Sequence, residues 1–178
     1  MSVTIRLEGA KELQTALRNL SDEVREQVGR AVEGTAIMLR QDIVDRIQDG
    51  PASGVGYYRI FDAESGYMRI YAGNPDAYGP SKVVAVYKSD GKVNLDPFHQ
   101  ASAPGEAPAT DTGRLMGSIY FDREGPLTAT VGSKLAYAEW LEYGTSRMAP
   151  RPYFRPAVEA VRPKFERALE RALAGVIK

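Results

Sequence analysis

The amino-acid sequence predicts an α+β fold, in which a small, mostly antiparallel sheet is packed by two or three helices and carries an inserted β-hairpin. Two observations predict it: apolar residues recur at helical spacing in long segments, and stretches with strand-like alternation lie before and between them. The order strand, helix, helix, insertion, strand, strand, helix, helix is typical of helices packed on one face of a sheet. A chain of 178 residues, 43% hydrophobic and 26% charged, suits one domain over residues 1–178.

The first strand and helix follow from the N-terminal pattern. Residues 3–7 place Val, Ile and Leu at alternate positions, which predicts a short half-buried strand. After Gly9 the apolar residues Leu13, Leu17 and Leu20 recur at helical spacing and predict a helix.

A second, longer helix is predicted from Ser21 to about Ile47. Ser21 is a suitable N-cap, and Asp22 and Glu23 behind it suit the positive end of a helix dipole. Gly50-Pro51 ends the segment. The predicted apolar stripe consists of Val24, Val28, Val32, Leu39, Ile43 and Ile47.

Residues 51–110 form the predicted insertion, which contains six of the ten tyrosines. Tyr67 and Tyr71 fall on one face of a strand pattern, and residues 83–87 form a second one. Asp90-Gly91 suits a hairpin turn. We therefore expect a β-hairpin here, followed by an extended loop from Pro97 to Pro108.

The C-terminal part of the sequence predicts two short helices, two strands and one long helix. Thr112 can cap one helical turn, and residues 118–123 and 127–133 are predicted strands joined by a Glu-Gly-Pro turn. A short helix is predicted over Ala136–Tyr143. The last helix is predicted from about Arg155 to Ala174, with the stripe Val158, Val161, Phe165, Leu169 and Leu173.

Charge and composition exclude several classes of protein. Lys plus Arg equals Asp plus Glu, at 23 each, which argues against tight binding of nucleic acid but not against DNA sliding past. The chain has no cysteine, so disulfides and thiolate chemistry are excluded. The N-terminus lacks an apolar signal region and no apolar run approaches a membrane span. We expect synthesis in the cytoplasm and no membrane partner.

Few features of the sequence indicate a catalytic role. His99, near Asp96, could be a general base or a metal ligand, but it has no second histidine or cysteine and is better interpreted as an ordinary loop residue. No phosphate-binding glycine loop or nucleophile elbow is present. We expect no enzyme, with no catalytic residue, metal or cofactor. A nuclease or peptidoglycan hydrolase and a free DNA-binding protein remain the rival classes.

Three segments have distinctive residue patterns that do not match a catalytic motif. Residues 101–119 are rich in small residues and proline, and form either a linker or an arm on a neighbouring subunit. In residues 137–145 we expect Trp140 to pack in the core and Gly144 to end the helix. In residues 148–156 the prolines either set up a helix start or form an interface with the arginines as donors.

Together these segments resemble the family of tailed-phage proteins named after gene product ten of a lambdoid phage, which is grouped with tail-completion and tail-terminator proteins. The resemblance covers most of the chain and departs from the family at residues 55–97, which are longer and richer in tyrosine. The blocks that carry it are Val3-x-Ile5-x-Leu7-x-Gly9, Lys-Glu-Leu (11–13), Ala-Pro-Gly-Glu-Ala-Pro (103–108), Asp-Thr-Gly-Arg-Leu (111–115), Ser-Ile (118–119), Tyr-Ala-Glu-Trp-Leu-Glu-Tyr-Gly-Thr (137–145) and Pro-Arg-Pro-Tyr-Phe-Arg-Pro-Ala (150–157).

The resemblance implies a structural protein at the virion neck, at the head–tail junction. Terminators of this kind form hexameric rings that cap the tail tube and then dock on the stopper or connector ring of the head, while genomic DNA passes through the lumen without specific binding. A stopper or adaptor ring is the alternative. As subunit or ring contacts we expect the insertion and the loop at 148–156, through Tyr67, Tyr71, Tyr87, Arg147, Arg151, Tyr153, Phe154 and Arg155.

Overall fold

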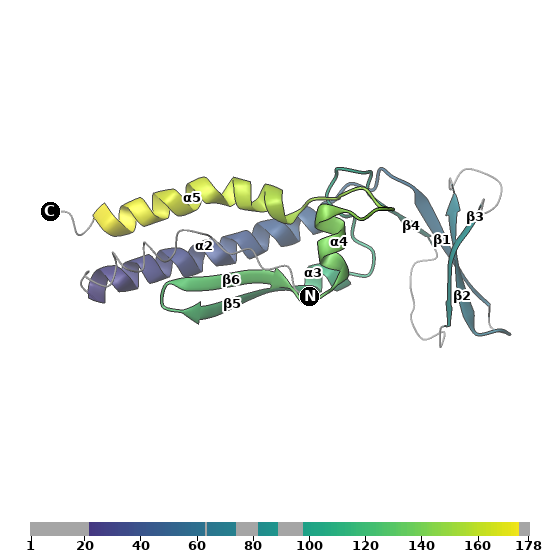
Figure 1. Cartoon of the computed structure of the whole chain (residues 1–178), viewed down its shortest axis with the longest axis horizontal. Helices are drawn as coiled ribbons and strands as arrows, with labels where there is room; N and C mark the ends of the chain where they lie inside the picture. The colour runs from purple at the N-terminus through teal and green to yellow at the C-terminus, as the bar shows by residue number, and fades with distance from the viewer. Residues whose placement is uncertain (1–21, 63, 74–81, 89–97, 175–178) are drawn as a thin grey trace.

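The computed structural model describes residues 22–62, 64–73, 82–88 and 98–174. The predicted strand at 3–7, the helix at 10–20 and the Asp90-Gly91 turn lie outside these residues. The described part confirms the α+β class. Its elements form an elongated body of helices and one hairpin, with a separate sheet at one end (Figure 1).

Two long helices form the body. Helix α2 spans Asp22–Gln48, and helix α5 spans Phe154–Ala174 and runs back alongside it (Figure 1). Both confirm the helices predicted from the sequence, with bounds that differ by one residue at most ends. Val24 and Ile43 of the predicted α2 stripe are fully buried, because a helix buries the residues that share one face.

A β-hairpin packs against α2. Strands β5 (Ile119–Gly125) and β6 (Thr128–Ser133) pair antiparallel, as predicted. The turn between them approaches α2 at Gly29, where a Cβ atom would lie 2.7 Å from the carbonyl oxygen of Pro126. A side chain at this position would therefore push the hairpin away from the helix.

The core divides into two clusters along the body. The larger one lies where α2, the hairpin and the start of α5 meet, and it takes in Ile43, Ile47, Ile119 and Phe154. The smaller one joins Val24 and Val28 to the far end of α5. The body is thus held together at both ends of its long helices.

The insertion is larger than the expected hairpin. It contains strands β1 (Gly56–Asp62), β2 (Tyr67–Gly73), β3 (Lys82–Lys88) and β4 (Phe98–Gln100). They form an antiparallel four-stranded sheet in the order β3-β2-β1-β4. This sheet stands beyond the end of the helical body (Figure 1).

Two expectations for the insertion are therefore corrected. Strand β1 was not predicted, because Tyr57, Tyr58 and Phe61 do not alternate strictly, although aromatic residues favour strands. The loop predicted to begin at Pro97 contains β4, whose His99 lies opposite Tyr57 of β1. His99 is therefore a strand residue and not a loop residue.

Candidate functional site

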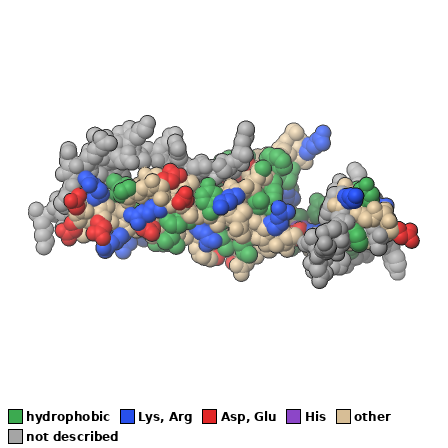
Figure 2. All heavy atoms as spheres, turned by 90° about the horizontal axis from the view of Figure 1, so that it is seen from below, with side chains coloured by type: hydrophobic (Ala, Val, Ile, Leu, Met, Phe, Trp, Pro, Cys, Tyr) green, Lys and Arg blue, Asp and Glu red, His purple; other side chains and the backbone are tan. Residues whose placement is uncertain are grey.

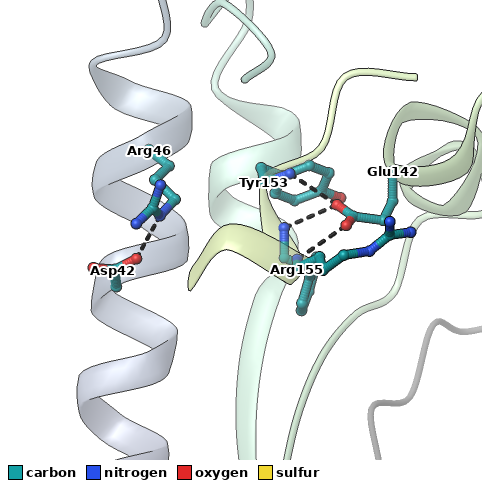
Figure 3. A network of polar contacts seen from close by, with 6 residues as sticks. Asp42, Arg46, Glu142, Tyr153 and Arg155 are labelled. Atoms are coloured by element: carbon teal, nitrogen blue, oxygen red, sulfur yellow. Dashed lines mark hydrogen bonds and ion pairs between the residues drawn. The ribbon is translucent and has the colours of Figure 1, made fainter. Parts of the chain in front are cut away.

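Glu142, near the end of helix α4 (Tyr137–Tyr143), connects α4 to the beginning of α5. Its side chain is only 2% exposed. One carboxylate oxygen accepts the backbone N–H groups of Tyr153 at 2.8 Å and Phe154 at 2.9 Å, and the other accepts that of Arg155 at 2.9 Å (Figure 3). These are N–H groups that the first turn of α5 cannot satisfy itself, so Glu142 caps α5 from another helix.

Tyr153 and Phe154 lie in the core beneath this cap. Their exposed fractions are 0% and 1%, and their ring centroids are 5.0 Å apart. The Tyr153 hydroxyl donates to the carbonyl oxygen of Ala138 at 3.3 Å. The expectation that these two side chains anchor a subunit contact is corrected, because neither reaches the surface. Of the two alternatives for this segment, a helix start or an interface, the helix start applies to Tyr153 and Phe154.

Arg151 also has an internal role. Its Nε and Nη2 atoms donate to the carbonyl oxygen of Ser102 at 3.2 and 3.1 Å, and its backbone N–H donates to that of Leu141 at 2.6 Å. Close by, the Gly105 N–H donates to the Pro150 carbonyl oxygen at 2.9 Å. Arg151 therefore holds the loop after β4, at Ser102, against the segment that precedes α5.

The loop after β4 is further closed by Glu106. Its carboxylate accepts the hydroxyl of Ser53 and, at 2.9 Å, the backbone N–H of Ala103. These hydrogen bonds lower the pKa of Glu106 below 4.5. These contacts join the insertion to the body through the segment at 101–106, as the linker expectation for this segment had it.

The outer face of α4 has a different character. Trp140 is 55% exposed and Tyr143 is 56% exposed. The expectation that Trp140 packs in the core is wrong, because α4 turns Ala138 and Glu142 inward, one turn apart, and Trp140 falls on the opposite face. Large aromatic side chains this exposed on a rigid helix are typical of protein contacts.

One arginine contacts these rings, and a second lies in the turn that follows α4. The Arg155 guanidinium carbon lies 5.7 Å from the centroid of the Tyr143 ring, within the range of a cation–π contact. Arg147 is exposed in the turn that follows α4, where its N–H donates to the Thr145 hydroxyl. We call this set the aromatic–basic surface; it consists of Trp140, Tyr143, Arg147 and Arg155.

The tyrosines of the insertion differ in their placement. Tyr67 begins β2 and is 42% exposed, whereas Tyr71 in the same strand is half-buried. Tyr87 lies in β3 opposite Met68. The sheet also exposes Phe61. The expected contact residues of the insertion thus lie on a sheet separate from the aromatic–basic surface.

A hollow of about 320 Å³ lies between the insertion and the body. Its lining includes His99, Asp111, Arg114 and Tyr137. Asp111 forms an ion pair with Arg59, and the His99 Nδ1 atom lies 3.8 Å from Asp111 Oδ1. Within the described residues, no group of three His, Cys, Asp or Glu side chains could hold a metal ion. Because Asp111 contacts both Arg59 and His99 of the insertion, it links the insertion to the body.

Helices that are long and apolar enough to cross a membrane do not occur in the part of the chain that the structure describes. No protein-family model, no curated protein and no solved structure matches this chain.

Proposed function

We propose that this protein is a structural ring subunit of the neck of a tailed bacteriophage, where it terminates the tail tube and joins the tail to the head. The observation that carries the proposal is the exposed Trp140 and Tyr143 pair with Arg155, on a helix whose position Glu142 fixes. Tryptophan, tyrosine and arginine dominate the binding energy of protein contacts. A contact surface on a rigid support is what a ring subunit requires.

Four of the segments that carry the family resemblance, all within the described residues, support the proposal because they come together in space. The segment 103–108 is bonded to 150–157 through Gly105 and Pro150. The segment 137–145 is bonded to 150–157 through Glu142. Segment 111–115 shares the hollow with Tyr137. These four segments therefore form one connected unit, which also presents the aromatic–basic surface.

The shape and charge of the molecule suit a place in a stack of rings. The sheet of the insertion stands beyond one end of the body (Figure 1), where it can reach the next ring or an adjacent subunit. The formal net charge is zero, and a strongly basic lumen would hold the genome back. The proposed partners are five further copies in a hexameric ring, the stopper or connector ring, the tail tube protein and DNA in transit.

The test is electron microscopy of lysates from a phage that lacks this gene, with the gene restored from a plasmid as the control. We expect filled heads beside unjoined or overlong tails. Empty, leaking heads beside free tails of normal length would overturn the terminator role in favour of a stopper or adaptor ring. Normal joined particles would overturn a neck role altogether.

A further inference from the structure

The outer face of α2 is the second unusual surface of the body. Ile37 and Met38 are 51% and 48% exposed, although they lie in the middle of the helix. Two exposed carboxylates lie about two and three turns beyond them on the same side, at Asp45 in the helix and Asp49 just after its end. We call this set the α2 outer surface; it consists of Ile37, Met38, Asp45 and Asp49.

The two carboxylates lie at an electrostatically unfavourable place. Asp45 is in the last turn of α2 and Asp49 follows its end, where the helix dipole is negative. Within the described residues, neither carboxylate forms an ion pair; the Asp45 carboxylate accepts only the Gln41 side-chain amide, at 2.6 Å. An arginine from another molecule would offset both the charges and the dipole.

The aromatic–basic surface has the opposite arrangement. Arg155 lies in the first turn of α5, which contains no acidic residue and where the dipole is positive. Among the residues described, the side chains of Arg155 and Arg147 form no ion pair with a carboxylate. Both surfaces thus combine two large exposed apolar side chains with two unpaired charges, and the charges have opposite sign.

The two surfaces lie on different sides of one rigid unit. Ile43 and Ile47 of α2 enter the same core cluster as Ala138 of α4, so the outer faces of both helices point away from it. In the close view, Tyr153 lies between α2, which carries Arg46, and Glu142 of α4 (Figure 3). In the space-filling view, apolar and basic side chains mix along the middle of the molecule, and most acidic ones lie toward the end away from the sheet (Figure 2).

We infer that the aromatic–basic surface of one copy binds the α2 outer surface of the next copy. This inference rests on the proposed function and specifies how its ring closes. The charges are complementary, and each surface supplies apolar side chains to the contact. Because the two surfaces differ, the contact is head-to-tail, and its repetition gives a ring and not a closed dimer.

The experiment measures the mass of the purified full chain by light scattering and analytical centrifugation over a range of concentrations. One variant carries Arg147→Glu and Arg155→Glu; the other carries Asp45→Arg and Asp49→Arg. We expect each to weaken association by more than about 100-fold, since like charges then face one another. A chain with all four substitutions restores the attraction and is expected to form rings again. Lys164→Glu and Glu166→Arg, at exposed positions of α5, serve as matched controls.

A mixing experiment tests the head-to-tail character. One chain carries Trp140→Ala with Arg155→Ala, and the other carries Met38→Lys with Asp45→Lys. Each alone is expected to stay monomeric, whereas a mixture forms pairs, because only one intact contact remains. Dimers of the second variant alone would overturn the inference, since they would require the aromatic–basic surface to bind itself.

The same variants separate this inference from the proposed function. If the wild-type chain assembles only on tails, the set is scored by head–tail joining in the gene-deficient phage. Rings or joining that survive both charge reversals would overturn the proposed contact and leave the neck role intact. Normal joining in the absence of the gene would overturn the neck role itself.

Discussion

The Glu142 carboxylate accepts the backbone N–H of Tyr153 at 2.8 Å, eleven residues further along the chain. The same side chain accepts two more N–H groups, from Phe154 and Arg155. One acid therefore holds the end of α4 against the beginning of α5. This contact brings together the two helix ends that carry Tyr143 and Arg155, whose ring and guanidinium lie 5.7 Å apart.

Glu142→Ala is expected to lower the free energy of unfolding by at least about 3 kcal/mol, because it leaves three N–H groups without an acceptor, two of them buried. Urea unfolding followed by circular dichroism measures it. Glu142→Gln keeps one acceptor oxygen and should lose less. Glu139→Ala, on the same helix, is the control and should stay within about 0.5 kcal/mol of wild type. A loss no greater for Glu142→Ala than for Glu139→Ala would contradict the capping role.

A second prediction concerns Tyr153 at alkaline pH. Burial, and next the charge of Glu142, raise the pKa of Tyr153 far above its ordinary value of 10. The folded state therefore keeps a proton that the unfolded state releases, so the stabilisation is complete below pH 10 and is lost as the pH rises above it. Tyr153→Phe should flatten this loss. It should also cost about 1 kcal/mol at neutral pH, through the hydrogen bond to Ala138.

Stability curves at pH 7, 10 and 11 measure this dependence. If wild type and Tyr153→Phe lose stability equally between pH 10 and 11, the titration belongs to another group. Tyr143→Phe, at an exposed ring, is the matched control and should leave the wild-type slope unchanged.

The local patterns of the sequence were sufficient for the body of the fold. Helices α2 and α5 and strands β5 and β6 follow from periodicity and from turn residues that act over a few positions. Strand β4 could not be predicted in this way, because it has only three residues and exists through its pairing with β1. Such a strand is stabilised by a partner more than 40 residues away in the sequence, and no local signal marks it.

The candidate site was predicted in part. Arg147 and Arg155 are exposed as a contact role requires, whereas Tyr153 and Phe154 are buried. Trp140 was expected in the core because a tryptophan side chain has a large apolar area. The inward position of Glu142 could not be predicted from the sequence, since the N–H groups that stabilise its buried carboxylate come from another segment.

A third prediction concerns the turn that joins the insertion to the body. Hydrogen bonds from Ser53 and Ala103 lower the pKa of Glu106 below its usual 4.5. The folded state thus binds this proton more weakly than the unfolded state, so the stabilisation is present above pH 4.5 and is lost as the pH falls through the lower folded value. Carbon NMR titration should give a midpoint below 4.5, and Ser53→Ala should raise it. A midpoint that Ser53→Ala leaves unchanged would remove Ser53 as the cause.

The last prediction separates a core role of Trp140 from a contact role. Because Trp140 is 55% exposed, Trp140→Ala should change the free energy of unfolding by no more than about 1 kcal/mol. Phe154→Ala, at a side chain only 1% exposed, is the comparison and should cost about 3–5 kcal/mol. Both are measured by urea unfolding, and Trp140→Ala is also tested for head–tail joining in the gene-deficient phage. A folded, stable Trp140→Ala chain that fails to join tails would locate its effect at a contact with another molecule. A loss of stability equal to that of Phe154→Ala would return Trp140 to the core, and the aromatic–basic surface would then lose its central residue.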